Sequence, residues 1–399
     1  MGLAQLGPGG HNAGQWAIPD LVTVPFLLKG QRLMFKRLVA TAGSVVMALA
    51  GLTVSASLAQ AAAPAGSCRH VTGPFHMHKN EITSSTGKRY IPYGIVVTGL
   101  GNPNWAEHQP GDSAEITASA ESWCANTVEL EVFQYGMFNA DGSVNSAFLG
   151  LVESEVSQAL RLGLVVAITD QTEGGPPGSA GLPEAQTKAF WNVLNGIYGH
   201  NTDVIFDLYN EPRRVGAGNE TSVWRYWRNG GTYQGTKYIG MQTLASYLRR
   251  IGSRNLFWIE GPHTGGSLQY IRQYQVTRAG PLEYGENHPG MVNSPHNAAY
   301  WNTRFGDNAS AVPIIETEWT NYASTRSCWA NAPKSVPRFL AYLAQHHMGL
   351  MAWTLAPGVL VESGNLADPT RIKSNWACKN GLDEGAGHQF MRFFRRYNS

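Results

Sequence analysis

The sequence has no excess of either charge and only four cysteines in 399 residues. Lys and Arg total 30 and Asp and Glu total 28, so the formal net charge is +2. This balance predicts no nucleic-acid partner, because such partners are bound by clustered positive charge. No Gly-rich phosphate loop follows any strand-like run, and no Cys or His spacing resembles a zinc site. We therefore expect no bound metal and no cofactor.

The N-terminal region has the pattern of an export signal that does not begin at Met1. Two basic residues, Lys36 and Arg37, precede a run of apolar and small residues that ends at Ala59-Gln60-Ala61, a small-residue cleavage pattern. A membrane anchor is the alternative, because the run is nearly long enough to span a bilayer. Interleaved Gly, Ser and Thr favour the signal peptide. The prediction is an over-extended start at residues 1–33, a signal peptide at residues 34–61 and a secreted mature protein, free of the membrane, at residues 62–399.

All four cysteines lie in the predicted mature protein, at positions 68, 124, 328 and 378. An even number of cysteines in an exported chain suggests two disulfides. Connectivity cannot be read from the spacing, and we expect neighbours in sequence to pair, Cys68 with Cys124 and Cys328 with Cys378. Buried free thiols are the alternative.

Apolar runs typical of buried strands alternate with helical patterns along the mature chain. The eight strand-like runs are Tyr90–Val97, Ala125–Phe133, Gly163–Thr169, Asp203–Tyr209, Asn255–Glu260, Leu282–Glu286, Ala311–Glu316 and Gly349–Thr354. The helical patterns include Ser146–Leu162, Pro183–Tyr198, Lys237–Ile251, Lys334–His346 and Gly387–Tyr397. This alternation predicts an α/β fold, a (β/α)8 TIM barrel in a single catalytic domain, with an open doubly wound sheet as the alternative.

Polar side chains follow the predicted strands at their carboxyl ends, where barrel enzymes carry their chemistry. The strand-like run that ends at Tyr209 leads directly into Asn210-Glu211-Pro212, and a later one leads into Glu318-Trp319. A carboxyl group at the mouth of a buried strand is costly to ionise, which favours the protonated form that a general acid needs. Glu211 alone could be a solvated strand end. A second strand-end carboxylate at Glu318 favours catalysis, because hydrolysis of a glycosidic bond requires two.

From about Val71 to the C-terminus the chain resembles glycoside hydrolase family 5, the cellulase-type family of barrel glycosidases. The resemblance is carried by Asn210-Glu211-Pro212, by Pro313-Ile-Ile-Glu-Thr-Glu318-Trp319, by His288 and by Trp353. It implies a retaining hydrolase that cleaves a polysaccharide or oligosaccharide, a β-1,4-glucan, by double displacement. It also implies a monomer that needs no cofactor.

The same resemblance implies a role for each matching residue. Glu211 would be the acid/base and Glu318 the nucleophile. Contacts with substrate are implied for Asn210, His288, Trp353, Gln171 and Trp319. Asn210 would bond to the sugar 2-hydroxyl, Trp353 would lie beneath the sugar, and Gln171 stands where the family usually has His.

Two positions leave alternatives open. Glu316 competes with Glu318 as nucleophile, because residues two apart on a strand face the same way. The family places the nucleophile directly before an aromatic residue, which favours Glu318. Glu129 stands where an Arg that supports the nucleophile is expected, and an ionised Glu there would repel another carboxylate. A β-mannan or another β-glycoside is the alternative substrate, and a sugar-binding protein without catalysis is the alternative class.

Overall fold

The computed structural model describes residues 68–101, 112–172, 181–216, 218–287, 297–319, 332–355, 360–361, 378–379, 382–383 and 387–398. The chain divides into two units, Met1–Ala61 and Ala62–Ser399. All described residues belong to the second unit, so the predicted start and signal peptide lie outside them and stay predictions. None of the described helices is long and apolar enough to cross a bilayer.

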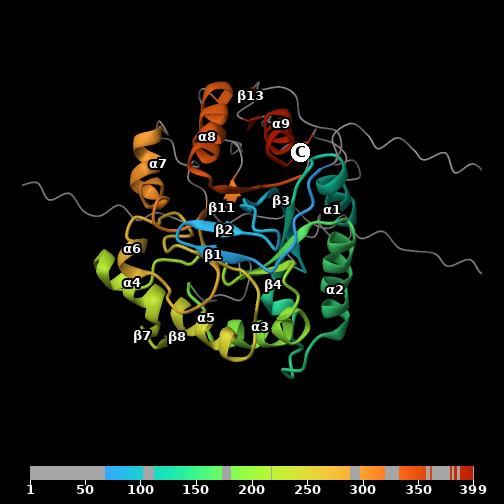
Figure 1. The fold of residues 1–399 in the computed structure, drawn as a ribbon. Helices are drawn as coiled ribbons and strands as arrows, with labels where there is room; N and C mark the ends of the chain where they lie inside the picture. Colours follow the sequence, from blue (N-terminus) through green and yellow to red (C-terminus); the bar gives the residue numbers. More distant parts are fainter. Residues whose placement is uncertain are drawn as a thin grey trace, which may run out of the picture. The chain divides into compact units, whose positions relative to one another are not determined.

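Eight parallel strands in the described part of the chain close into a barrel (Figure 1). In barrel order they are β3 (Tyr93–Leu100), β4 (Thr127–Phe133), β5 (Val165–Gln171), β6 (Val204–Asp207), β9 (Phe257–Glu260), β10 (Leu282–Asn287), β11 (Ile314–Trp319) and β12 (Gly349–Ala352). Strand β12 then pairs with β3 and completes the ring. Each of the eight predicted strands overlaps one of these, so the predicted barrel is confirmed and the open sheet is wrong.

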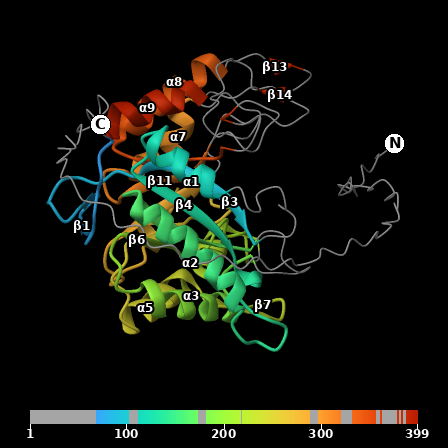
Figure 2. The same ribbon diagram turned by 90° about the vertical axis from the view of Figure 1, so that its right-hand side faces the viewer.

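Helices follow the barrel strands in sequence and surround them (Figures 1 and 2). They are α1 (Asp112–Glu121), α2 (Ser146–Arg161), α3 (Ala185–Tyr198), α4 (Glu220–Asn229), α5 (Met241–Arg250), α6 (Ile271–Tyr274), α7 (Ala298–Arg304), α8 (Ala332–His346) and α9 (Gly387–Asn398), with short 3₁₀ turns η2 (Gln134–Gly136) and η3 (Gly306–Asn308). Helix α5 begins later than the sequence pattern predicts, because the preceding residues form a hairpin of β7 (Gly231–Tyr233) and β8 (Thr236–Tyr238).

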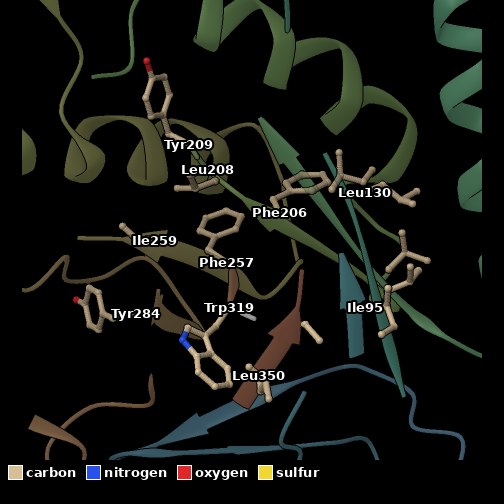
Figure 3. Packing of buried hydrophobic residues seen from close by; sticks show 14 of the residues in the cluster. Ile95, Leu130, Phe206, Leu208, Tyr209, Phe257, Ile259, Tyr284, Trp319 and Leu350 are labelled. Carbon is tan, nitrogen blue, oxygen red and sulfur yellow. The ribbon is translucent and has the colours of Figure 1, made fainter. Parts of the chain in front are cut away.

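Two layers of apolar side chains hold the barrel together, because successive residues of a strand point to opposite faces. On β5, Val165 and Ala167 belong to the cluster inside the barrel, whereas Val166 and Ile168 belong to the cluster between strands and helices. Figure 3 shows part of this outer cluster, including Ile95, Leu130, Phe206, Phe257, Trp319 and Leu350. The inner or outer placement of a residue therefore decides whether it can reach the barrel interior.

A short antiparallel hairpin, β1 (His76–His78) with β2 (Glu81–Thr83), precedes the barrel. Phe75 and Ile82 belong to the inner cluster, together with residues from the beginnings of barrel strands. The ring of Phe75 stacks on Tyr90 with 4.4 Å between ring centroids. The hairpin segment thus fills the amino-terminal end of the barrel with apolar groups and leaves the carboxyl-terminal end for polar side chains.

Strand β3 begins at Tyr93, three positions after the predicted start at Tyr90. The intervening Pro92 has no N–H to donate to a neighbouring strand. Its carbonyl accepts a hydrogen bond from the Leu350 amide at 2.8 Å, so the segment joins the barrel only from Pro92 onward. The Tyr90 side chain remains buried, with its hydroxyl 2.7 Å from Thr127 Oγ1.

A disulfide joins Cys68 to Cys124, with 5.2 Å between the two Cα atoms. It ties the amino-terminal segment of the second unit to the connection between α1 and β4. This predicted pairing is confirmed. For the second pairing, Cys378 begins the short strand β13 (Cys378–Lys379), which pairs with β14 (Leu382–Asp383), but Cys328 lies outside the described residues.

Candidate active site

Side chains from three neighbouring regions of the barrel meet around Asn287, the last residue of β10. Its amide nitrogen lies 3.1 Å from Glu318 Oε2 on β11 and 3.4 Å from Asn210 Oδ1, just after β6. The exposed fractions of Asn287, Asn210 and Glu318 are 0%, 4% and 8%. Where water is excluded, a bond from an amide to a carboxylate is stronger than in solution. One buried amide therefore links the two segments that the sequence predicts to be catalytic.

The backbone turns sharply at Glu211, directly after Asn210. Glu211 adopts a left-handed conformation with φ of 48°, which is uncommon for a residue with a side chain. Its N–H donates to Glu260 Oε2 at 2.8 Å. The next carbonyl, that of Pro212, accepts a hydrogen bond from the Thr264 amide at 2.8 Å. The segment is thus held from the side of β9, while the Glu211 side chain remains partly exposed.

Strand β11 contains a bulge just before its end. Glu316 pairs with Glu286 of β10, but the next pair is Asn287 with Glu318, so two residues of β11 lie opposite one residue of β10. The pairing with β12 shifts over the same stretch, between Glu316 and Trp319. A bulge adds one residue to a strand and redirects the side chains that follow it.

The bulge separates the two candidate nucleophiles. Ile315 belongs to the inner cluster, and Thr317 bonds to Glu260, so Glu316 between them faces the helices. Consistent with this, burial and then the charges of Asp307 and Glu316 raise the pKa of Tyr342 on α8. Without the bulge, Glu318 would share the outward direction of Glu316. With it, Glu318 faces inward and reaches Asn287.

A family model, Cellulase (glycosyl hydrolase family 5), matches residues 85–357. The chain belongs to glycoside hydrolase family 5. It is therefore a glycoside hydrolase, and its barrel is the fold of similar solved structures. The match covers more than half of the chain and includes Asn210, Glu211 and Glu318.

Solved structures of glucanases have the same fold at low sequence identity. A β-glucanase from Saccharophagus degradans in complex with cellotetraose has a TM-score of 0.59 at 16% identity, over 84% of this chain and 96% of that one. An endoglucanase catalytic domain from Thermobifida fusca, also with cellotetraose, has a TM-score of 0.57 at 16% identity, over 81% and 98%. The catalytic domain of the major endoglucanase from Xanthomonas campestris has a TM-score of 0.58 at 15% identity, over 80% and 98%.

Trp319 does not lie where a substrate contact requires it. Its side chain is 4% exposed and packs in the outer cluster (Figure 3), with ring centroids 4.5 Å from Phe339 on α8 and 5.4 Å from Phe390 on α9. The physical reason is alternation, because the residue after an inward Glu318 points outward. The aromatic residue that identifies the family motif here anchors β11 to the helices.

The other predicted substrate contacts have different placements. Gln171 is the last residue of β5, and its exposed fraction is 3%. It lies an even number of residues from Val165 and Ala167, so its side chain faces the barrel interior as theirs do. Trp353 is partly exposed and packs against both the inner and outer clusters at the end of β12. His288 lies outside the described residues.

Glu129, at the position of the expected Arg, lies deep in the barrel and accepts a hydrogen bond from Thr169 Oγ1 at 2.7 Å. Burial, and then the charge of Asp207, raises the pKa of Glu129 well above its ordinary value. The neutral form is therefore favoured, and a neutral carboxyl group exerts little repulsion on Glu318. Arg213 and Arg214, which follow the catalytic motif, have exposed side chains.

The sequence predicts no role for Asn287 or Glu260, although both are polar residues at strand ends. Their position at the carboxyl ends of strands was the one signal in the sequence that pointed to the site. Their contacts were not predictable, because they depend on the turn at Glu211 and on the bulge in β11. Within the described ranges, no group of three or more His, Cys, Asp or Glu side chains is arranged to hold a metal ion.

Proposed function

We propose that this family member is a secreted, retaining hydrolase of β-1,4-glucan in which Glu211 is the acid/base and Glu318 the nucleophile. The observation that carries the proposal is the Asn287 amide, which lies within hydrogen-bonding distance of both Asn210 and Glu318. The β-glucanase and the endoglucanase with similar folds were each solved with cellotetraose, a β-1,4-linked fragment, and this supports the choice of substrate.

The proposed reaction has two displacements. In the first, a Glu318 carboxylate oxygen attacks the anomeric carbon, the glycosidic bond breaks, and Glu211 gives its proton to the departing oxygen. In the second, Glu211 takes a proton from water, the water oxygen attacks the anomeric carbon, and the bond to Glu318 breaks. Both carboxyl groups return to their starting states. Asn210, Gln171, His288 and Trp353 are proposed as sugar contacts.

The test is hydrolysis by the mature protein of a panel of β-1,4-glucans, β-mannans and aryl β-glycosides, followed by NMR of the first-formed anomer. We expect glucan cleavage with a β-configured product. An α-configured first product would exclude double displacement. Faster cleavage of mannan would identify β-mannan, and not β-1,4-glucan, as the substrate. Binding of cello-oligosaccharides without turnover would favour the non-catalytic alternative.

Export is tested separately by N-terminal sequencing of protein recovered from the culture medium. We expect the sequence to begin at Ala62. Recovery of an intact residue 1 in the medium, or retention of the protein in membranes, would contradict the proposed leader.

A further inference from the structure

We infer that Glu260 is a positioning residue that fixes the backbone of the acid/base, Glu211, and links it to the strand of the nucleophile. Glu260 is the last residue of β9 and is fully buried. The inference rests on the roles proposed above for Glu211 and Glu318. It assigns to Glu260 no direct contact with substrate.

The two carboxyl oxygens of Glu260 bind two different parts of the site. Oε2 accepts from the Glu211 N–H at 2.8 Å, and Oε1 accepts from Thr317 Oγ1 at 2.8 Å. Thr317 directly precedes Glu318. A single side chain on β9 thereby connects the segment after β6 to the bulge of β11, across β10.

The left-handed turn at Glu211 makes this acceptor necessary. With φ of 48°, the turn points its N–H away from the barrel ladder and toward Glu260. A partly buried N–H without an acceptor is destabilising, so loss of Glu260 would favour another backbone conformation at Glu211. A different conformation there would redirect the Glu211 carboxyl group, which must reach the departing oxygen.

The surroundings of Glu260 leave its side chain little freedom. A Cβ added at Gly265, where φ is +70°, would lie 2.7 Å from Glu260 Oε2, and one added at Gly285 would lie 2.8 Å from Glu260 Cγ. The Glu260 carbonyl accepts a hydrogen bond from Trp227 Nε1 at 2.8 Å. The two glycines thus leave just enough space for the Glu260 side chain, and Trp227 holds its backbone, so the carboxyl group stays where it reaches both donors.

The charge state of Glu260 guides the choice of variants. Burial, and then the charge of Asp207, raises its pKa well above the ordinary value. The amide of Gln matches a neutral carboxyl group in shape and can accept from the Glu211 N–H while it donates to Thr317 Oγ1. Met has a similar length and no acceptor oxygen, so Glu260→Gln and Glu260→Met differ mainly in the hydrogen bonds.

The experiment compares these variants on cellotetraose, which has a poor leaving group, and on dinitrophenyl β-cellobioside, whose leaving group needs no proton. General acid catalysis typically contributes about 10²–10⁴-fold. We expect Glu260→Met to lower kcat/KM on cellotetraose about 100-fold and to change kcat/KM on the activated substrate little, because kcat/KM reports the first displacement, in which only cellotetraose needs a proton. Glu260→Gln should recover most of the activity on cellotetraose.

A matched control is Glu283→Met on the neighbouring strand. Glu283 is also buried inside the barrel, but it accepts from Trp258 Nε1 and contacts neither catalytic segment. We expect this control to lower both activities alike through stability. An equal loss on both substrates for Glu260→Met would overturn the inference, as would failure of Glu260→Gln to recover activity.

A double variant tests whether Glu260 acts through Glu211. Residues that act as a unit are strongly non-additive, so Glu260→Met should cause no further loss in a Glu211→Gln background. Additive losses would overturn the inference. If Glu260→Met does not fold, Thr317→Val removes one of the two bonds and should show the same dependence on the leaving group, in weaker form; a uniform loss would again contradict it.

The design separates this inference from the proposed function. If the wild-type protein cleaves neither substrate, or if Glu211→Gln lowers kcat/KM equally on both, the proposed function fails whatever the Glu260 variants do. If those two results are as proposed and Glu260→Met acts uniformly, only the role of Glu260 is wrong.

Discussion

Asn287 provides a donor to Glu318 in a site where the sequence resemblance predicts an Arg at position 129. The expected Arg is replaced by Glu129, which bonds to Thr169 instead. The amide of Asn287 is neutral, so it orients Glu318 without the attraction of a full positive charge. Hydrogen bonds to a charged group are worth about 1.5–3 kcal/mol, which makes this contact significant for a nucleophile.

Replacing Asn287 with Ala removes that donor. We expect kcat/KM for β-1,4-glucan to fall about 10- to 100-fold, equivalent to about 1.4–2.7 kcal/mol in transition-state free energy, with both leaving-group classes affected. Asn255→Ala is the control, because Asn255 is equally buried but its amide donates to Tyr198, Asn201 and Val204 carbonyls. It should lower stability without this kinetic loss; equal kinetics for the two variants would contradict the role of Asn287.

At the scale of the element, the decisive feature of β11 is its bulge. Regular alternation leaves Glu316 and Glu318 equivalent, and the sequence offers only the family motif to choose between them. The extra residue breaks that equivalence and directs Glu318 inward. A sequence alignment of this strand with a relative that lacks the bulge would need a one-residue gap. Without the gap, Glu318 would be aligned one residue away from the nucleophile of the relative.

Azide rescue distinguishes the two glutamates experimentally. Removal of a retaining nucleophile leaves space in which azide can attack the anomeric carbon directly and give a product of inverted configuration. We expect azide to restore activity to Glu318→Gly on an activated aryl glycoside, with an α-glycosyl azide identified by NMR. Glu316→Gly should lose stability, because a cavity forms in the outer layer, and should show no rescue. Rescue of Glu316→Gly instead would reverse the assignment.

The strands were predictable because buried parallel strands are continuously apolar, as Val204–Phe206 shows. Their ends were less predictable, since Pro92 and the β7–β8 hairpin change where elements begin. The residues of the site likewise divide into those that the sequence predicts and those that only the three-dimensional structure places. Asn210 and Glu318 could be placed from strand position and family motif, whereas the outward side chain of Trp319 depends on pairing between strands, which a linear pattern does not contain.

At the scale of the whole molecule, the barrel interior holds several buried acidic side chains. Burial raises the pKa of Asp207 to about 7 and that of Glu283 to about 8. An acid whose pKa is higher in the folded state keeps its proton while the unfolded chain releases it. Its contribution to stability is therefore complete below the ordinary pKa and is lost as the pH rises through the raised value.

We expect the free energy of unfolding to fall as the pH rises from about 4 to about 8, by about 1.4 kcal/mol per pH unit for each proton released. Glu283→Gln should make this slope shallower between about pH 4.5 and pH 8, by about 1.4 kcal/mol per pH unit, because one proton fewer is released on unfolding. Urea unfolding across this range measures it. A slope for Glu283→Gln identical to that of the wild-type protein would contradict a raised pKa at Glu283.

The Cys68–Cys124 disulfide has a practical consequence for preparing the protein. Thiols remain reduced in a typical cytoplasm and oxidise in the periplasm or outside the cell. Cytoplasmic expression would therefore yield a barrel in which the segment from Cys68 to Phe75 has no disulfide to the rest of the protein. Kinetic measurements on such a preparation would describe a molecule in which the amino-terminal end of the barrel is held less firmly than in the disulfide-bonded protein. Recombinant protein is therefore best directed to an oxidising compartment.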